Sequence, residues 1–215
     1  MLEIKNITKK YTKGTARYTA LDDVSLNIDK GEFVTVVGPS GSGKSTLLHT
    51  AGGLIHPDSG QVIFKGKDIY SLNSHDAELY RKQNVSFVFQ QFHLMPYLTV
   101  YENIKMSCYK PGQCDNIDQY LKDCNLIEHK FKFPSELSVG EKQRTAFIRA
   151  IITGPDLLFA DEPTGNLDEL NSSVIFSLIG DYHKKGGTVL LVSHDPEVTK
   201  YSTRTIKLQS GKIMN

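Results

Sequence analysis

The chain has 215 residues and a formal net charge of +1, with 39% hydrophobic and 23% charged residues. This length allows one sizeable domain with its own core. The near-neutral charge lacks the basic excess that is typical of nucleic-acid-binding proteins, so we expect no nucleic-acid partner.

The sequence contains no apolar run long enough to cross a membrane and begins without an apolar targeting segment. Its three cysteines, Cys108, Cys114 and Cys124, are odd in number and match no zinc or C-x-x-C spacing. We interpret them as free thiols in a reducing compartment. We therefore expect a cytoplasmic protein, in which any membrane role comes through a partner.

The first ninety residues predict antiparallel strands, followed by a strand, a tight loop and a helix. Apolar alternation and apolar runs predict strands at residues 2–7, 24–28, 33–37, 61–65 and 85–89. A polar loop is expected between Lys9 and Tyr18. The helix after the third strand should end near Gly52, a common C-terminal signal. A short helix before the last of these strands is predicted to have Ser74 as its cap.

The character of the sequence changes after residue 90. From 99 to about 153 the apolar spacing is helical, with breaks at 111–112 and 132–134. The remaining elements are predicted as strands at 156–161, 188–192 and 204–208 and helices at 170–184 and after Asp195. Buried apolar strands that alternate with helices predict an α/β fold with a mostly parallel sheet and helices on both faces.

We predict a single domain over residues 1–215. Within it, residues of about 1–89 and 154–215 would form the core together with an antiparallel β subdomain. Residues of about 90–153 would form an inserted α-helical subdomain.

Residues 38–46, with the sequence Gly-Pro-Ser-Gly-Ser-Gly-Lys-Ser-Thr, match the G-x-x-x-x-G-K-S pattern of a phosphate-binding loop. The glycines let successive backbone N–H groups point inward, and the following helix adds its own N-terminal N–H groups. Lys44 supplies a charge for the outer phosphates, and Ser45 supplies a hydroxyl for Mg²⁺. The candidate phosphate-binding residues are Gly38, Pro39, Ser40, Gly41, Ser42, Gly43, Lys44, Ser45 and Thr46.

Polar side chains follow three other predicted strands. Asp161 and Glu162 end one apolar strand, so that Asp161 could hold Mg²⁺ through water while Glu162 polarises an attacking water. His194 and Gln90 also follow strands, at the edge where open α/β sheets bind ligands. An amide such as that of Gln90 can contact both metal and water. We therefore predict Glu162, His194 and Gln90 as catalytic residues, and Ser45, Gln90 and Asp161 as metal ligands.

Two further segments complete the pattern: Leu-Ser-Val-Gly-Glu-Lys-Gln-Arg at 137–144 and Gly-Asn-Leu-Asp at 165–168. With these motifs in this order, the whole chain resembles a nucleotide-binding ATPase subunit of an ATP-binding cassette (ABC) transporter. The resemblance implies a P-loop NTPase with a RecA-like sheet, which hydrolyses ATP with Mg²⁺ as a head-to-tail homodimer around two ATP molecules. Each ATP would touch the phosphate loop of one chain and the signature, residues 138–141, of the other.

The resemblance also implies roles for single residues. Tyr11 would stack on adenine, Gln90 would be the glutamine of the Q-loop, and His194 would be the switch histidine. Tyr11 has an alternative interpretation as an aromatic that packs locally. The nucleotide contacts implied around the signature and the D-loop are Ser138, Val139, Gly140, Glu141 and Asp168.

A finer resemblance, carried by residues 51–54, 87–96, 98–103 and 134–138, is to the lipoprotein-release and macrolide-export branch. It implies that the chain powers a separate permease from the inner face of the membrane, for export of peptide, lipid, lipoprotein or antimicrobial. The alternative is an ATPase that regulates a membrane or cell-wall process without transport, as in cell-division relatives.

The permease would dock between Gln90 and Tyr101, where the sequence has several apolar residues. These side chains have an alternative role, which is to pack the helical insert against the core.

The signature differs from the usual Leu-Ser-Gly-Gly-Gln at Val139 and Glu141. Valine adds bulk where a phosphate must approach, and it cannot adopt a positive φ at low cost. Ser138 and Glu141 also have the S-x-x-E spacing of a capping box for the helix that runs to about residue 153. We predict a working signature with a weaker closed dimer.

Overall fold

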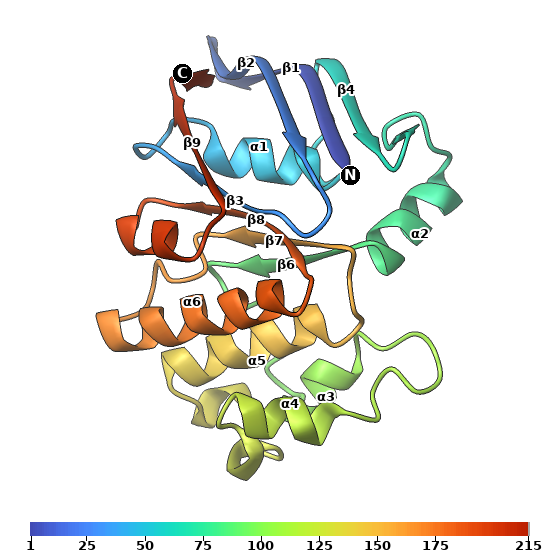
Figure 1. Cartoon of the computed structure of the whole chain (residues 1–215), viewed down its shortest axis with the longest axis vertical. Helices are drawn as coiled ribbons and strands as arrows, with labels where there is room; N and C mark the ends of the chain where they lie inside the picture. The colour runs from blue at the N-terminus through green and yellow to red at the C-terminus, as the bar shows by residue number, and fades with distance from the viewer. Residues whose placement is uncertain (215) are drawn as a thin grey trace.

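The structure of the chain, a computed structural model, describes residues 1–214 with the exception of the Lys13 side chain. Residue 215, the last of the predicted core range, lies outside the described residues. Five layers follow one another along the long axis (Figure 1). They are an antiparallel sheet, helix α1, a mainly parallel sheet, the helices α5 and α6, and the short helices α3 and α4.

The antiparallel sheet has four strands in the order β2-β1-β4-β5. Its strands are β1 (Leu2–Lys13), β2 (Ala16–Ile28), β4 (Ser59–Phe64) and β5 (Lys67–Asp68).

The second sheet has six strands in the order β10-β9-β3-β8-β7-β6, in which all neighbours are parallel except β10 and β9. Its strands are β3 (Phe33–Val37), β6 (Val85–Phe89), β7 (Leu157–Asp161), β8 (Thr188–Ser193), β9 (Arg204–Gln209) and β10 (Lys212–Met214). The predicted mostly parallel α/β sheet is confirmed.

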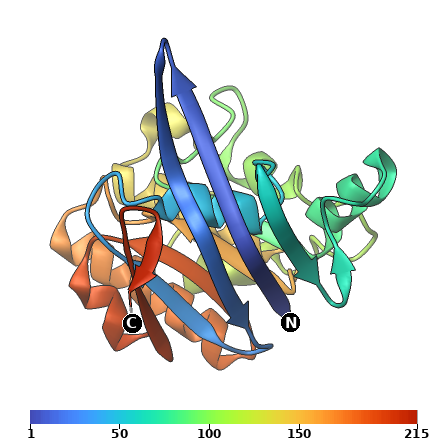
Figure 2. The same ribbon diagram turned by 90° about the horizontal axis from the view of Figure 1, so that it is seen from above.

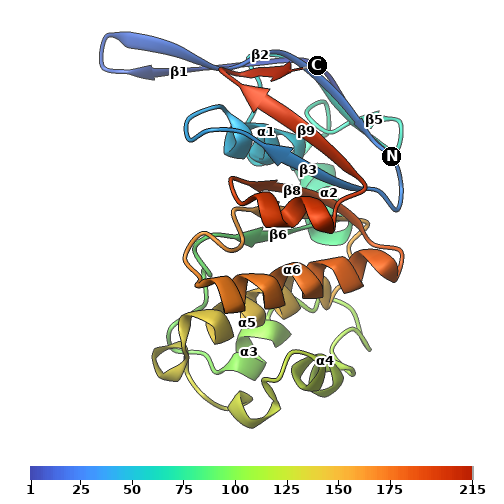
Figure 3. The ribbon, with the colours of Figure 1, turned by 60° about the vertical axis from the view of Figure 1, so that its left-hand side comes forward.

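The helices lie on both faces of this sheet (Figures 1 and 3). The α-helices are α1 (Lys44–Ala51), α2 (Ser74–Gln83), α3 (Val100–Lys105), α4 (Ile117–Asp123), α5 (Val139–Ile151) and α6 (Glu169–Lys184). Three 3₁₀ turns are η1 (Ile127–His129), η2 (Pro134–Glu136) and η3 (Pro196–Lys200). In residues 1–214, no helix is both long and apolar enough to span a membrane.

Adjacent residues of the buried strands belong to two different hydrophobic cores. In β7, Phe159 packs in a cluster with β1, β2 and α1, whereas Leu158 packs in a second cluster with Phe147 of α5. Leu190 and Leu191 of β8 divide in the same way. Side chains alternate across a strand, so a strand that is apolar at every position must have both of its faces covered.

The predicted polar loop between Lys9 and Tyr18 is wrong, because β1 and β2 continue as a hairpin to Lys13 and Ala16. The hairpin projects beyond the rest of the molecule in Figure 2. The described side chains of residues 12–19 in this ribbon are exposed. A two-stranded ribbon with both faces exposed to solvent lacks the alternation of apolar and polar residues by which a half-buried strand is predicted.

Two smaller predictions also need correction. Helix α2 is capped by Asn73 rather than Ser74, since the Asn73 side chain accepts a hydrogen bond from the Asp76 N–H. Cys108 and Cys114 form a disulfide across the turns that follow α3, with their Cα atoms 6.0 Å apart. Cys124 is a buried free thiol, as predicted, and its burial raises the pKa to about 12.

Candidate active site

The phosphate-binding loop connects β3 to α1 and has its tightest turns at two glycines. Gly41 and Gly43 have φ angles of +76° and +104°, which glycine adopts at low cost. A Cβ atom on Gly43 would lie 2.2 Å from the carbonyl oxygen of Ala20, so a larger residue does not fit there. Because α1 begins at Lys44, the unpaired N–H groups of its first turn lie next to the loop.

Lys44 is buried under this loop, with only 6% of its surface exposed. Its Nζ donates to the carbonyl oxygens of Gly38 (2.9 Å) and Pro39 (3.2 Å) and lies 3.5 Å from Oε1 of Glu162. The three donors of the ammonium group therefore face three oxygen atoms. The positive charge of Lys44 is therefore already in place next to the loop, where a phosphate group would bind.

Asp161 lies between two residues of α1. Ser45 Oγ donates to Oδ1 of Asp161 (2.8 Å), and His49 Nε2 lies 3.0 Å from Oδ2. Hydroxyl and carboxylate oxygens are the donors that Mg²⁺ prefers, so this pair fits the expected metal. His49 was missed by the sequence analysis, although it lies four residues after Ser45 and thus on the same face of the helix.

Glu162 leaves β7 with a φ of +46°, in the left-handed region that residues other than glycine rarely occupy. Its N–H donates to the carbonyl of Val192 in β8, which fixes this conformation. Its Oε2 lies 2.8 Å from Nδ1 of His194 and accepts the His194 N–H at 3.2 Å. The ends of β7 and β8 thus bring Glu162 and His194 together.

Gln90 follows β6 and is held by the segment after Glu162. Its side-chain Nε2 donates to Oδ1 of Asn166 (3.3 Å), and its carbonyl oxygen accepts from the Asn166 side chain (3.0 Å). A Cβ atom on Gly165 would lie 2.7 Å from the same Nε2, so the glycine permits this close approach. Asn166 is a second contact of the site that the sequence analysis did not single out.

A hollow of about 670 Å³ has walls that include Tyr11, Gln90, Lys44, Glu162 and His194, whereas Asp161 is not among its lining residues. The Tyr11 ring also stacks on Tyr18, with 5.5 Å between ring centroids. Tyr11 therefore packs locally on Tyr18 and at the same time lines the hollow.

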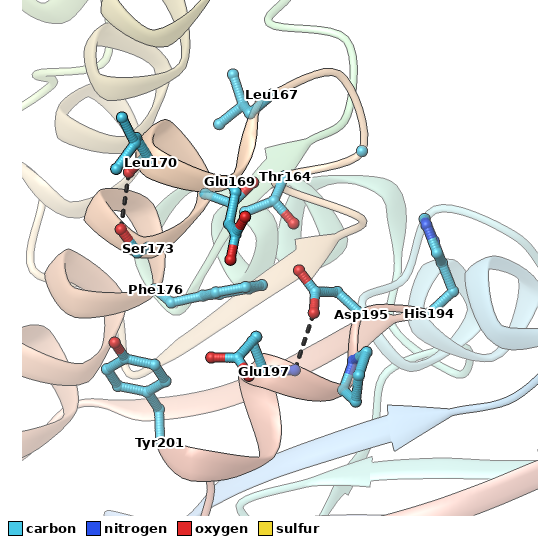
Figure 4. Close-up of a pocket in the computed structure, with 13 residues that line it drawn as sticks. Thr164, Leu167, Glu169, Leu170, Ser173, Phe176, His194, Asp195, Glu197 and Tyr201 are labelled. Atoms are coloured by element: carbon cyan, nitrogen blue, oxygen red, sulfur yellow. Dashed lines mark hydrogen bonds between the residues drawn. The ribbon is translucent and has the colours of Figure 1, made fainter.

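A second hollow, of about 600 Å³, lies on the other side of His194, between residues 164–167, α6 and η3 (Figure 4). Asp168 stands close by as the N-cap of α6, where it accepts the Asn171 N–H (2.8 Å). This backbone hydrogen bond lowers the pKa of Asp168.

The signature forms the predicted capping box at the start of α5. Ser138 Oγ accepts the Glu141 N–H (3.3 Å), and Glu141 Oε2 accepts the Ser138 N–H (2.7 Å). Val139 is the first residue of the helix, is 45% exposed and does not have a positive φ, so the expected backbone strain is absent. A Cβ atom on Gly140 would lie 2.3 Å from Oδ1 of Asn171, so a larger residue there would have to displace the Asn171 side chain.

Comparison with known proteins agrees with this geometry. A sequence profile of the ABC transporter family matches residues 21–165. The chain belongs to the ABC transporter family. It is 39% identical to an uncharacterised ABC transporter ATP-binding protein, MJ1508, from Methanocaldococcus jannaschii, over 100% of this chain and 98% of that protein. It is also 39% identical to the macrolide export ATP-binding/permease protein MacB of Chlorobaculum tepidum, over all of this chain and 34% of that longer protein.

Solved ABC cassettes share the fold. The dimeric structure of MJ0796, described as a bacterial ABC transporter cassette, is 36% identical and covers 100% of this chain and 97% of that one, with a TM-score of 0.91. A post-hydrolysis state of the same cassette, bound to ADP and Pi, has the same TM-score at 35% identity. For cbiO1 from Clostridium perfringens, part of an ABC transporter complex, the identity is 27%, the coverage is 100% and 86%, and the TM-score is 0.86.

These likenesses confirm the predicted P-loop NTPase fold. They also confirm that the chain is an ATP-binding, ATP-hydrolysing subunit of the ABC transporter type.

Proposed function

We propose that two copies of this ABC subunit close head to tail around two ATP molecules and drive a membrane permease. The observation that carries this proposal is the composition of the hollow around Lys44, which includes none of residues 138–141. A signature that contacts nucleotide must then come from another copy. The dimeric structure of MJ0796 supports a dimer as the working unit.

Hydrolysis requires a base for water, and Glu162 is suited to this role. His194 Nδ1 holds Oε2 of Glu162, while Oε1 faces Lys44 at 3.5 Å. Phosphate oxygens bound to Lys44 would compete with Oε1 for the ammonium group. Glu162 would then be free to accept a proton from water through Oε1, with its orientation maintained by His194.

Mg²⁺ would be held by Ser45 directly and by Asp161 through water, with Gln90 contributing from the end of β6. When bound, the metal supplies positive charge that neutralises the phosphate oxygens. The 2.8 Å hydrogen bond between Ser45 and Asp161 supports this assignment, because it brings two suitable oxygen donors together.

ATP favours the closed dimer because it contacts both copies there, and hydrolysis removes this difference in binding. The test is Glu162→Gln, which should accumulate as an ATP-bound dimer and lose about 100-fold or more in kcat. Glu3→Gln, a matched change outside the site, should behave like the wild type. Undiminished hydrolysis by Glu162→Gln would exclude Glu162 as the base, and failure to dimerise with ATP would exclude the two-copy site.

The permease is proposed to dock at residues 90–101. Arg149 of α5 fixes the start of this segment by donating to the carbonyl oxygens of Phe92 (2.8 Å) and His93 (2.6 Å). Tyr97 is 72% exposed, while Leu94 is half-buried, so the segment offers an aromatic side chain on a braced backbone. Positive charge near this segment comes from Arg81 and Arg149, which line a hollow of about 580 Å³ between α2 and α5.

The likeness to MacB, which unites ATP-binding and permease parts in one protein, supports a permease as the partner. The macrolide export named for MacB also favours export as the process that this chain powers. We propose that the cargo is a peptide, lipid, lipoprotein or antimicrobial and that the chain acts at the inner face of the membrane. Purification of the chain with its native membrane fraction, followed by identification of the co-purifying membrane protein, tests this assignment. A stable partner without membrane-spanning segments would exclude it.

A further inference from the structure

His129 contacts the signature from outside helix α5. It is the last residue of η1, and its Nδ1 atom lies 3.3 Å from Oε1 of Glu141. The other carboxylate oxygen of Glu141, Oε2, accepts the Ser138 N–H at 2.7 Å. One carboxylate group therefore joins His129 to the backbone of the signature.

This contact is largely shielded from water. The side chains of His129 and Glu141 are 24% and 19% exposed, and the His129 Nδ1 atom itself is enclosed. Within the described part of the chain, Nδ1 makes no well-aligned hydrogen bond, so Oε1 of Glu141 is the acceptor within its reach.

Arg144 of α5 also acts on Glu141, but its guanidinium charge does not change with pH, and the remaining charged groups around this contact are paired or face solvent. Arg144 of α5 donates to Asn171 at 3.5 Å, and Lys130 pairs with Asp118 of α4 at 2.6 Å. Glu128, on η1 itself, is exposed. The protonation of His129 therefore acts mainly on Glu141.

An imidazole gains and loses its charge between about pH 5 and 8, unlike lysine or arginine. Glu141 stays ionised over this range. Its burial would raise the pKa, but the hydrogen bonds from Ser138 and the nearby His129 and Arg144 bring the pKa below its ordinary value. A protonated ring donates from both nitrogens, whereas a neutral ring donates from Nδ1 in only one of its two tautomers.

We propose that His129 is a positioning residue for the signature: it holds the Glu141 carboxylate, and through it the Ser138 backbone, more firmly when protonated. This inference rests on the proposed two-copy site, in which Ser138 meets the nucleotide of the other copy. It predicts that the ATP-bound dimer is tighter at pH 6 than at pH 8. If His129 only packs η1 against α5, replacing it with arginine would leave the pH dependence of the dimer unchanged.

The first measurement needs no dimer. The amide signal of Ser138 is followed by NMR from pH 5.5 to 8.5 in the full chain without nucleotide. The wild-type signal should titrate in this range, and His129→Arg should abolish the titration because the charge is then permanent. His56→Arg, a change in a histidine that packs on Tyr70, should titrate like the wild type.

The second measurement is the dimer dissociation constant with ATP in the Glu162→Gln background, determined by sedimentation at pH 6 and pH 8. It should rise by about two- to fivefold with pH, as expected for a partly exposed ion pair. With the added change His129→Arg, the dissociation constant should stay at its low pH 6 value at both pH values. With His129→Gln, it should stay at its high pH 8 value at both. All of these variants contain His194, so a difference between them is due to His129.

A Ser138 signal that does not titrate, or a His129→Arg dimer that keeps the full pH dependence, overturns the inference. If Ser138 titrates as expected but no variant dimerises with ATP, the proposed two-copy function fails, and the consequence assigned here for the dimer fails with it. The two failures are thus distinguishable.

Discussion

His49 Nε2 lies 3.0 Å from Oδ2 of Asp161, while Oδ1 of the same carboxylate accepts the hydroxyl of Ser45. One oxygen of the carboxylate therefore accepts a hydrogen bond from α1, and the other lies beside an imidazole nitrogen that makes no well-aligned hydrogen bond among the described residues. A partner that orients a metal-binding carboxylate sets its affinity for the metal. His49 belongs to none of the motifs of the site, yet the proposed Mg²⁺ position depends on it.

We predict that His49→Gln weakens the Mg²⁺ dependence of ATP hydrolysis by about tenfold, the lower range for loss of such a supporting contact. The maximal rate at saturating Mg²⁺ should change much less, since the catalytic residues remain. ATPase activity titrated with Mg²⁺ measures both quantities. His56→Gln is the matched control, because His56 contacts Tyr70 rather than the site. An equal loss at all Mg²⁺ concentrations would contradict the assignment.

Val139 offers a test of the unusual signature. The side chain is 45% exposed at the first position of α5, where it meets the other copy in the proposed dimer. Both Val139→Gly and Val139→Ala should tighten the ATP-bound dimer by about fivefold or more, because excess bulk in a packed contact typically costs roughly 1–3 kcal/mol. Alanine keeps the helix propensity, so agreement between the two variants separates bulk from backbone flexibility. Unchanged dimerisation and turnover in both would show that Val139 is neutral.

Asp156 should stabilise the fold only above acidic pH. Its carboxylate accepts from Lys65 (2.8 Å) and Asn84 (2.7 Å), and these hydrogen bonds outweigh the effect of burial, so the pKa lies below its ordinary value. A lowered pKa gives stability that is present above the unfolded-state value and is lost as the pH falls through the folded-state value.

Asp156→Asn should accordingly lower the midpoint of urea unfolding at pH 7, and the difference from wild type should shrink below about pH 4. Asp181→Asn, which removes an exposed pair with Lys184, should change the midpoint little at either pH. A difference that stays constant with pH would mean that the carboxylate charge is not the cause.

Tyr97 tests the proposed docking segment. Because it is 72% exposed, Tyr97→Ala removes little packing and should leave the urea midpoint of the chain near its wild-type value. Binding of the purified permease should fall by about tenfold or more, as for an aromatic residue at the centre of an interface. Phe131→Ala, at a residue 74% exposed elsewhere on the helical layer, is the control. Loss of stability together with permease binding would favour a packing role.

The parts of the site that could be predicted are those whose chemistry is local in sequence. The phosphate loop has its glycines, Lys44 and Ser45 within nine residues, and the capping box spans only four. The strand that ends at Asp161 and the strand before His194 can also be predicted from the sequence. Both faces of each strand are buried, so each reads as a continuous apolar run.

The contacts that were missed depend on how distant segments are arranged. His49 meets Asp161, and Asn166 meets Gln90, only because the strand order β3-β8-β7-β6 brings the ends of these parallel strands to one edge of the sheet. The pairing of Cys108 with Cys114 depends on the turns between them, which residue spacing does not specify.

Phe159 and Leu158 are adjacent in the sequence but contribute to separate cores on opposite faces of one sheet. A change of size at Leu158 therefore alters the packing of α5, which begins at the signature and whose Arg149 contacts the proposed docking segment. A change of size at Phe159 instead alters the packing of α1 and of the antiparallel sheet. Two functions of an ABC subunit, holding ATP and meeting other proteins, can thus vary through separate sets of substitutions, even though a single strand serves both.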